Sequence, residues 1–223
     1  MNSVVKLLAA AGLLAAASAA SAQSTGQWTV AVGLNKITPK VESGDISAPA
    51  LPHSKGDVNS NTQPVMVFAY GITDNISAEA AIGTPYKHKL YGAGAIEGTG
   101  QLGTVQALPP TVFLQYRFFA PSSRVRPYVG IGATYAYFMK ETGSGKMTAL
   151  TNPGAGEPTT FKIDNKLTYS LQAGVSVDLT DRIFANVALL KTKLSTDVHF
   201  SSGQQQHMKL DPQAAMLTVG YKF

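Results

Sequence analysis

Few side chains in this 223-residue sequence are spaced for catalysis or metal binding. The chain has four histidines and no cysteine, and it contains neither the HExxH spacing of zinc hydrolases nor the GxSxG turn of serine hydrolases. His53, Ser54 and Asp57 would form a hydrolytic triad only if a loop folded to assemble them. We therefore expect no catalytic residues, no metal site and no cofactor.

Two charged residues, Glu79 and Arg117, are placed to form an ion pair in a narrow interior. They lie beside short turns, in segments 76–84 and 112–118, where apolar and polar residues alternate. Each falls on the face opposite the apolar side chains, and a single charge in such an interior would be costly. We predict that the two lie close together as a structural plug, with a gate or ion pathway as the alternative.

Alternation of apolar and polar residues predicts that β-strands carry these side chains. Residues 167–179 alternate strictly, over a stretch longer than most strands of soluble proteins. Segments with this pattern recur along the chain, and they give eight predicted strands: 28–35, 65–72, 76–84, 112–118, 128–138, 167–179, 183–193 and 215–223.

The connections between these strands alternate between short turns and long segments rich in Gly, Pro and Ser. The turns are 73–75, 120–123 and 180–182, and the long segments are 39–62, 87–106, 141–160 and 199–211. An even strand number with this asymmetry is typical of outer-membrane barrels, although soluble barrels also show alternating strands. We predict an all-β protein, an eight-stranded antiparallel transmembrane barrel of the outer membrane.

Aromatic residues near the strand ends favour the membrane barrel over a soluble one, because such rings suit the two membrane–water interfaces. They are Trp28, Tyr116, Phe118, Phe184, Tyr221 and Phe223 near the turns, and Tyr86, Tyr135 and Tyr137 near the long segments. Tyr221 and Phe223 on the last alternating strand resemble the signal read by the outer-membrane assembly machinery, an expected partner. Lys191 and Lys193 would face lipopolysaccharide phosphates at the outer rim, or simply be solvated.

The remaining sequence features concern export and charge. Residues 1–22 have the basic start, apolar core and small-residue cleavage site of a signal peptide, which leaves 23–223 as one barrel domain. The longest apolar run, 7–20, is shorter than the ~20 residues that a membrane-spanning helix needs. The net charge of +5 is small and unclustered, so nucleic acid is not an expected partner.

Six stretches in order complete the pattern: NSNTQ at 59–63, TDNI at 73–76, TPYKHK at 84–89, LPPT at 108–111, RPYVGIG at 126–132 and KLDP at 209–212. The set resembles the outer membrane protein W (OmpW) family of Gram-negative bacteria. The resemblance implies an eight-stranded barrel with a narrow, rather apolar interior that admits small hydrophobic molecules at the top. It also implies that they leave sideways through the wall into the membrane, and that some relatives serve hydrocarbon uptake.

Inward-facing residues of small size or without charge predict room for a slim apolar molecule, although a filled lumen is the alternative. The predicted lining residues are Gly83, Phe113, Thr134 and Gln172. Pro85, Pro109 and Pro110 cannot donate to a β-ladder, so pairing between the third and fourth strands should break there. The break would offer a sideways opening, or it would only end the strands.

These features predict a barrel, without enzymatic activity, that mediates diffusive uptake of small hydrophobic molecules and lies in outer-membrane lipid and lipopolysaccharide. A structural barrel that displays its loops to bacteriocins, phage or host surfaces is the alternative. A barrel enzyme whose site is assembled from loop residues is a third hypothesis.

Overall fold

The computed structural model describes residues 25–48, 50, 52–154 and 157–223. The predicted signal peptide, residues 1–22, lies outside the described residues. Among the helices of the described part, none is long and apolar enough to cross a membrane.

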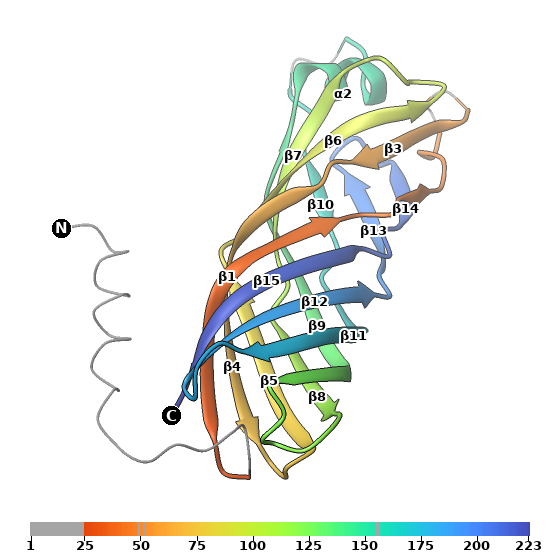
Figure 1. Ribbon diagram of the computed structural model, residues 1–223. Helices are drawn as coiled ribbons and strands as arrows, with labels where there is room; N and C mark the ends of the chain where they lie inside the picture. Colours follow the sequence, from red (N-terminus) through yellow and green to blue (C-terminus); the bar gives the residue numbers. More distant parts are fainter. Residues whose placement is uncertain (1–24, 49, 51, 155–156) are drawn as a thin grey trace, which may run out of the picture.

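Within the described residues, eight strands form a closed antiparallel barrel (Figure 1). Each pairs with the next around the ring, and the last pairs with the first to close it. In ring order they are β1 (Trp28–Thr38), β4 (Asn61–Gly71), β5 (Ile76–Gly83), β8 (Thr111–Arg117), β9 (Val125–Gly143), β11 (Lys166–Asp178), β12 (Ile183–Thr192) and β15 (Gln213–Lys222). The predicted barrel is confirmed.

The outer surface of the barrel is apolar, because burial alternates along each strand and many of the exposed residues are apolar. In β1, Thr29 and Ala31 point inward and are buried, whereas Val32 and Leu34 are exposed. The pattern continues around the ring, where Leu189 on β12 is 64% exposed. A surface so apolar is stable only against lipid or another apolar partner. The geometry therefore agrees with a membrane-spanning barrel.

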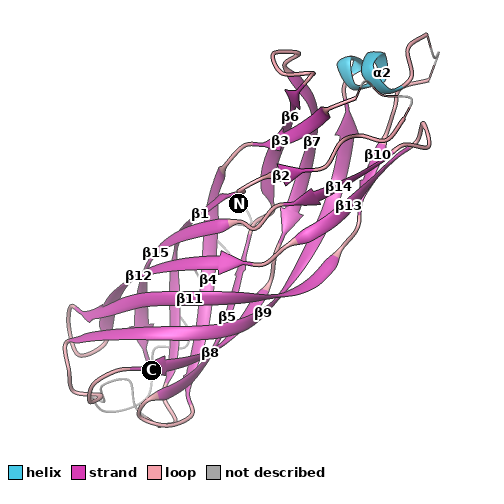
Figure 2. Cartoon of the chain, turned by 90° about the vertical axis from the view of Figure 1, so that its right-hand side faces the viewer, coloured by secondary structure: helices cyan, strands magenta, loops and turns pink. Residues whose placement is uncertain are grey.

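The segments predicted as long loops are mostly strands that prolong the barrel beyond one rim (Figure 2). We call this part the extension. It is built from the upper part of β9 together with β2 (Glu42–Ser43), β3 (Ser54–Val58), β6 (Tyr86–Gly94), β7 (Gln101–Leu108), α2 (Gly145–Thr151), β10 (Phe161–Ile163), β13 (Ser195–Phe200) and β14 (Gln205–Lys209). Sequence reasoning missed these strands because Gly, Pro and Ser within them were interpreted as loop signals.

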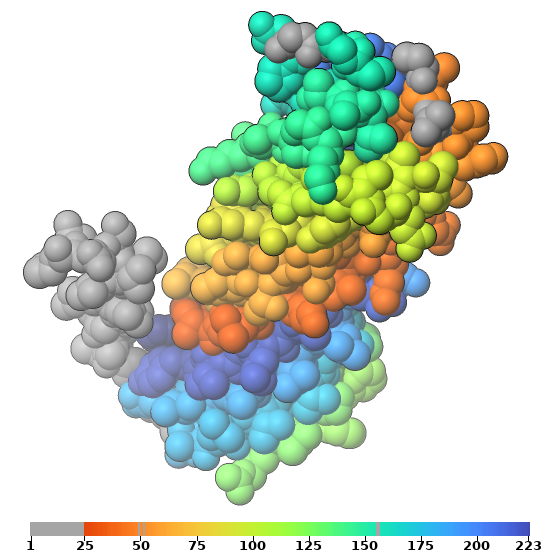
Figure 3. All heavy atoms as spheres, turned by 90° about the horizontal axis from the view of Figure 1, so that it is seen from above, coloured from red at the N-terminus to blue at the C-terminus, as the bar shows by residue number. Residues whose placement is uncertain are grey.

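The extension has an apolar interior of its own. Its buried residues include Phe138, Met147, Phe161, Phe200 and Met208, which come from five different elements. Seen from above, side chains around α2 and on β7 and β6, coloured green to yellow-green, form a continuous outer face beside the orange β3 (Figure 3). The extension is therefore a packed continuation of the barrel.

Two of the predicted interface aromatics point into the barrel instead. Phe184 falls between Ile183 and Ala185, which face outward, and its ring packs where a side chain at Gly220 would otherwise stand. Tyr86 is 3% exposed because the break at Thr84–Pro85 shifts the alternation by one residue. Other aromatics are exposed as predicted; they include Trp28, Tyr116, Phe118, Tyr135 and Tyr137.

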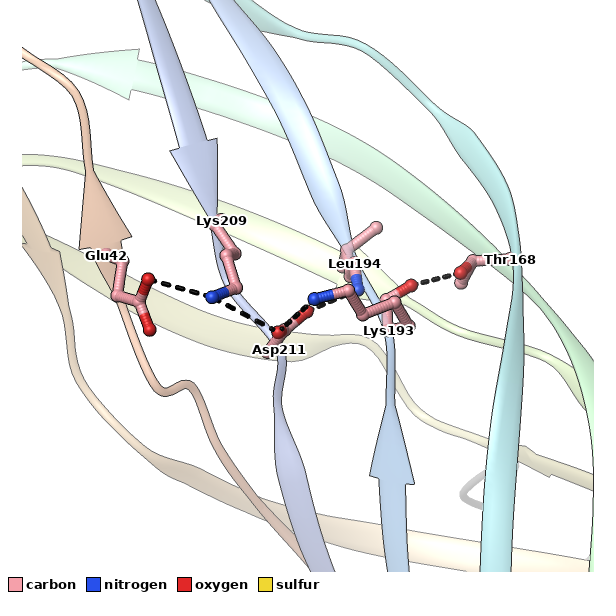
Figure 4. A network of polar contacts seen from close by, with 6 residues as sticks. All are labelled: Glu42, Thr168, Lys193, Leu194, Lys209 and Asp211. Carbon is pink, nitrogen blue, oxygen red and sulfur yellow. Dashed lines mark hydrogen bonds and ion pairs between the residues drawn. The ribbon is translucent and has the colours of Figure 1, made fainter.

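A polar network fixes the junction between the barrel and the extension (Figure 4). Asp211 accepts hydrogen bonds from Lys193 Nζ at 2.8 Å and from the Leu194 backbone N–H at 3.0 Å. Lys209 lies 3.9 Å from the same carboxylate and 2.8 Å from Glu42. Asp211 thus holds the bend at which β12 continues into β13 and β14 into β15. Lys193, predicted at the outer rim, is engaged in this network.

The Asp211 network makes stability depend on pH. Burial acts to raise the pKa of Asp211, but hydrogen bonds from Lys193 and Leu194 and the charges of both lysines outweigh it, so the pKa is lowered. Its contribution is therefore complete above the unfolded pKa of about 3.9 and is lost as pH falls through the lower folded pKa. We expect Asp211→Asn to lower the urea midpoint of unfolding at pH 7, and to lower it less near pH 2.

Asp181→Asn, at an exposed turn of the barrel, is the matched control and should leave the midpoint unchanged at both pH values. An equal loss for Asp211→Asn at pH 7 and near pH 2 would contradict this account, because the contribution of the carboxylate declines as pH falls through its lowered pKa.

Candidate functional site

A largely apolar cavity of about 150 Å³ lies inside the protein where the barrel continues into the extension. Val65 and Met216 line its lower part, and Phe161 and Phe200 line its upper part. These side chains come from β4, β15, β10 and β13, so both the barrel and the extension form the cavity. The lining is suited to an apolar molecule.

The predicted lining residues divide between this cavity and the region below it. Gly83 and Thr134 line the cavity, whereas Phe113 and Gln172 are buried beneath it. Gly83 lies so close to β4 that a Cβ atom there would be 2.5 Å from the Pro64 carbonyl oxygen. A larger residue at 83 would therefore push the strands apart rather than fill the cavity.

Three polar side chains stand together on one side of the cavity. Asn35 Nδ2 donates to Tyr86 Oη at 2.8 Å, and the Tyr86 and His88 rings stack with their centroids 6.4 Å apart. His88 Nδ1 lies 2.8 Å from the carbonyl oxygen of Asn59. All three side chains are buried and line the cavity.

His88 is buried, although it lies in segment 87–106, which was predicted to be a long loop. The other three histidines are on exposed parts of the extension beside carboxylates: His53 lies 3.4 Å from Asp45, His199 3.6 Å from Asp164 and His207 2.7 Å from Asp197. The described residues contain no cluster of three or more His, Cys, Asp or Glu suited to a metal ion.

The wall beside the cavity is interrupted at the three predicted prolines. Pairing of β5 with β8 runs from Ile76 to Ala81, and pairing of β6 with β7 begins only at Tyr86 opposite Ala107. Residues 82–85 and 108–110 are therefore not paired with each other, and they contain Pro85, Pro109 and Pro110. Each segment stays hydrogen-bonded to the strand on its other side. The Thr84 N–H donates to Pro64 O of β4 at 3.3 Å, and the Tyr135 N–H of β9 donates to Pro110 O at 3.1 Å. The break is thus confined to one seam.

The cavity reaches this seam. Ile82 and Pro109, one on each side of it, both belong to the cavity lining. Ile82 is also 49% exposed on the outer surface of the barrel. The same side chain therefore borders both the interior and the outside.

Below the cavity, Glu79 and Arg117 are both buried, but the register separates them. Glu79 lies opposite Phe113, whereas Arg117 is four residues further along β8, towards the short turns. No ion pair joins them among the residues that the structure describes. The expected direct contact is therefore not formed, because the two residues occupy different levels of the lumen.

Amide side chains connect the two charges instead. Arg117 Nη2 donates to Gln115 Oε1 at 2.8 Å, Gln115 Nε2 to Gln172 Oε1 at 2.7 Å, and Gln172 Nε2 to Glu79 Oε1 at 3.0 Å. The Arg117 guanidinium also lies 4.9 Å from the centre of the Tyr128 ring. We call this chain of groups the floor. Gln115 and Tyr128 were not singled out from the sequence, although the alternation places both on the inner face.

Further charges fill the lumen towards the short turns. Lys222 Nζ and Asp178 Oδ2 are 2.5 Å apart, and Arg126 Nη2 donates to the Asp74 carbonyl at 2.6 Å. At the rim, the Phe223 N–H donates to Trp28 O at 3.0 Å, and the Tyr221 and Phe223 rings meet at 5.1 Å. Polar and charged groups, many of them hydrogen-bonded to one another, thus occupy the lower half of the barrel, whereas the upper half is largely apolar.

Comparison with known proteins identifies the architecture. The model of the OmpW family matches residues 24–223. The chain belongs to the OmpW family. It is 32% identical to outer membrane protein W of Vibrio cholerae over 217 residues, which cover 95% of this chain and 96% of the relative. The resemblance seen in the sequence is therefore confirmed.

Solved structures agree with this fold. Outer membrane protein OprG from Pseudomonas aeruginosa superposes with a TM-score of 0.80 at 24% identity, covering 90% of this chain and 97% of that one. Outer membrane protein W of Escherichia coli gives 0.57 at 26% identity, with coverage of 90% and 99%. The protein is an outer-membrane barrel of a Gram-negative bacterium. Such barrels have short periplasmic turns and long extracellular segments, so we expect the short turns at the periplasmic end and the extension outside.

A substitution at Arg117 tests whether the floor blocks the passage of ions through the barrel. Arg117→Ala removes hydrogen bonds to Ser77 and Gln115 and the contact with Tyr128. We expect it to lower the free energy of unfolding by about 2–4 kcal/mol, because charged, buried hydrogen bonds are lost. We also expect a several-fold higher ion conductance in planar bilayers.

Arg182→Ala, at an exposed periplasmic turn, is the control for the loss of a positive charge. Unchanged conductance of a folded Arg117→Ala barrel would show that the floor does not limit ion passage.

Proposed function

We propose that this protein is a non-catalytic channel for diffusive uptake of small hydrophobic molecules across the outer membrane, working without a cofactor. The observation that carries the proposal is the apolar cavity of about 150 Å³, bounded below by the floor and reaching the seam at Ile82 and Pro109. A dry apolar cavity of roughly this size takes a molecule as large as benzene.

Energetics favour a sideways route out of the cavity. To continue downward, an apolar molecule would have to displace the hydrogen bonds that link Arg117, Gln115, Gln172 and Glu79. Separating these buried groups costs free energy, and an apolar molecule cannot compensate for it because it forms no hydrogen bonds with them. Through the seam it would instead meet the outer surface beside Ile82, where the surrounding medium is lipid. We infer that the ligand leaves by this lateral route.

The extension supplies the entry side in this proposal. In a barrel with polar loops, the region above the membrane would be filled with water. Here Phe138, Phe161 and Phe200 are buried inside the extension and make its interior apolar. These side chains continue the apolar lining above the membrane. A hydrophobic molecule could thereby avoid the charged lipopolysaccharide layer.

Filling the cavity tests the uptake proposal. Ala136 on β9 lines the cavity, whereas Ala133 on the same strand faces outward. We expect Ala136→Phe to slow naphthalene entry at least several-fold, because the ring occupies the apolar space, and Ala133→Phe to leave it unchanged. The measurement is naphthalene fluorescence in the lipid of vesicles that have lipopolysaccharide in the outer leaflet and contain the folded barrel.

Equal rates for wild type, both variants and protein-free vesicles would overturn uptake. They would favour the alternative in which the barrel serves contacts with surfaces, phage or bacteriocins.

The prolines of the seam test the lateral route. Replacing Pro109 and Pro110 by Thr restores two backbone donors, so strands β5 and β8 can pair further. We expect naphthalene to enter the vesicle lipid several-fold more slowly, while its binding to the barrel persists. Pro64→Thr, on the outer face of β4, is the matched control. Unchanged entry in a double variant with slower amide exchange at residues 82–85 would contradict lateral exit.

A further inference from the structure

Asn35 carries an unused hydrogen-bonding atom in the cavity wall. Its side chain is 9% exposed, and Nδ2 is engaged with Tyr86 Oη. Within the described part of the chain, Asn35 Oδ1 is buried with no hydrogen-bond partner. A buried acceptor without a partner destabilises a fold unless a ligand supplies the missing donor. The position of Asn35 in the lining makes a cavity ligand the natural donor.

Tyr86 provides the complementary group. Its hydroxyl oxygen accepts the hydrogen bond from Asn35, and a phenol can donate one hydrogen bond as well. No acceptor for that proton is present among the described residues. Tyr86 therefore offers a donor beside the Asn35 acceptor, and both belong to the cavity lining.

His88 adds a second acceptor. A carbonyl oxygen can only accept, so the contact with Asn59 O fixes the proton on His88 Nδ1 and leaves Nε2 with a free lone pair. The neighbours Lys87 and Lys89 are exposed, which places this part of β6 outside the membrane. Burial lowers the pKa of His88, while the hydrogen bond to Asn59 acts against it, and the net lowering keeps the ring neutral.

The balance of donors and acceptors selects the ligand. A carboxylate only accepts, so it would be repelled by Asn35 Oδ1 and His88 Nε2. An ammonium only donates, so it could not accept from the Tyr86 hydroxyl, and it would lose its hydration among largely apolar side chains. A hydroxyl group donates one hydrogen bond and accepts others. The rest of the lining is largely apolar and includes Val65 and Ala81, while the charged Lys55 and Asp57, which also border the cavity, are exposed.

We propose that Asn35, Tyr86 and His88 form a hydroxyl-binding subsite, so that the preferred ligands are small apolar molecules with one hydroxyl group, such as alcohols or phenols. The inference rests on the proposed function in using the same cavity, and it specifies the ligand class. The ligand hydroxyl donates to Asn35 Oδ1 or His88 Nε2 and accepts from the Tyr86 hydroxyl.

The test compares 1-naphthol with naphthalene, which differ only in the hydroxyl group. Equilibrium binding is measured to the full barrel in lipid nanodiscs, with empty nanodiscs to subtract partition into lipid. We expect 1-naphthol to bind about 5–10-fold more tightly, as one or two net hydrogen bonds would give. Asn35→Leu and Tyr86→Phe should each remove most of this preference for 1-naphthol over naphthalene.

Asn186→Leu is the matched control, because Asn186 is equally buried but does not line the cavity. It should keep the preference. A direct readout is the ¹⁵N resonance of His88 Nε2, which should shift with 1-naphthol and not with naphthalene.

Equal affinities for the two compounds in the wild type, or a preference that survives in both Asn35→Leu and Tyr86→Phe, would overturn the subsite. Failure of the proposed function is recognised separately, as naphthalene entry into vesicles no faster than without protein. Because the subsite is read from binding alone, either result can occur without the other.

Discussion

The backbone hydrogen-bond ladder that runs around the barrel and returns from β15 to β1 is the constraint on which the other features depend. In lipid, an unpaired N–H or carbonyl has no water to bind, so a spanning sheet must close on itself. Closure of eight strands leaves an interior only wide enough for side chains or one small ligand. The interruption at Pro85, Pro109 and Pro110 is therefore notable, because it lies in one seam beside the cavity.

The narrow lumen is divided into two chemically distinct halves. Below, hydrogen bonds link Arg117, Gln115, Gln172 and Glu79 across the barrel, which lowers the cost of burying the two charges. Above, apolar residues of the barrel and the extension surround the cavity. The boundary between these halves separates the polar floor, on the side of the short turns, from an apolar chamber on the side of the extension, and the seam lies beside that chamber.

Sequence alternation was a reliable guide inside the membrane and a poor one beyond it. It placed Glu79, Arg117, Thr134 and Gln172 on the inner face, as the structure has them. It misplaced Tyr86, because the break at Thr84–Pro85 shifts the alternation between β5 and β6. It also could not give the separation of Glu79 from Arg117, since the relative shift of two paired strands depends on barrel closure and not on the pattern within either strand.

The sequence by itself determined the number of barrel strands, the membrane-facing surface and the site of the proline seam, because these follow from local periodicity and from proline chemistry. Its six ordered stretches indicated the family by resemblance. Only the tertiary structure decided that the long segments form a packed extension, that Gln115 and Gln172 link the floor, and that Asn35, Tyr86 and His88 meet in one wall. Such contacts join residues far apart in the chain, and the closed ladder sets which of them share a level of the lumen.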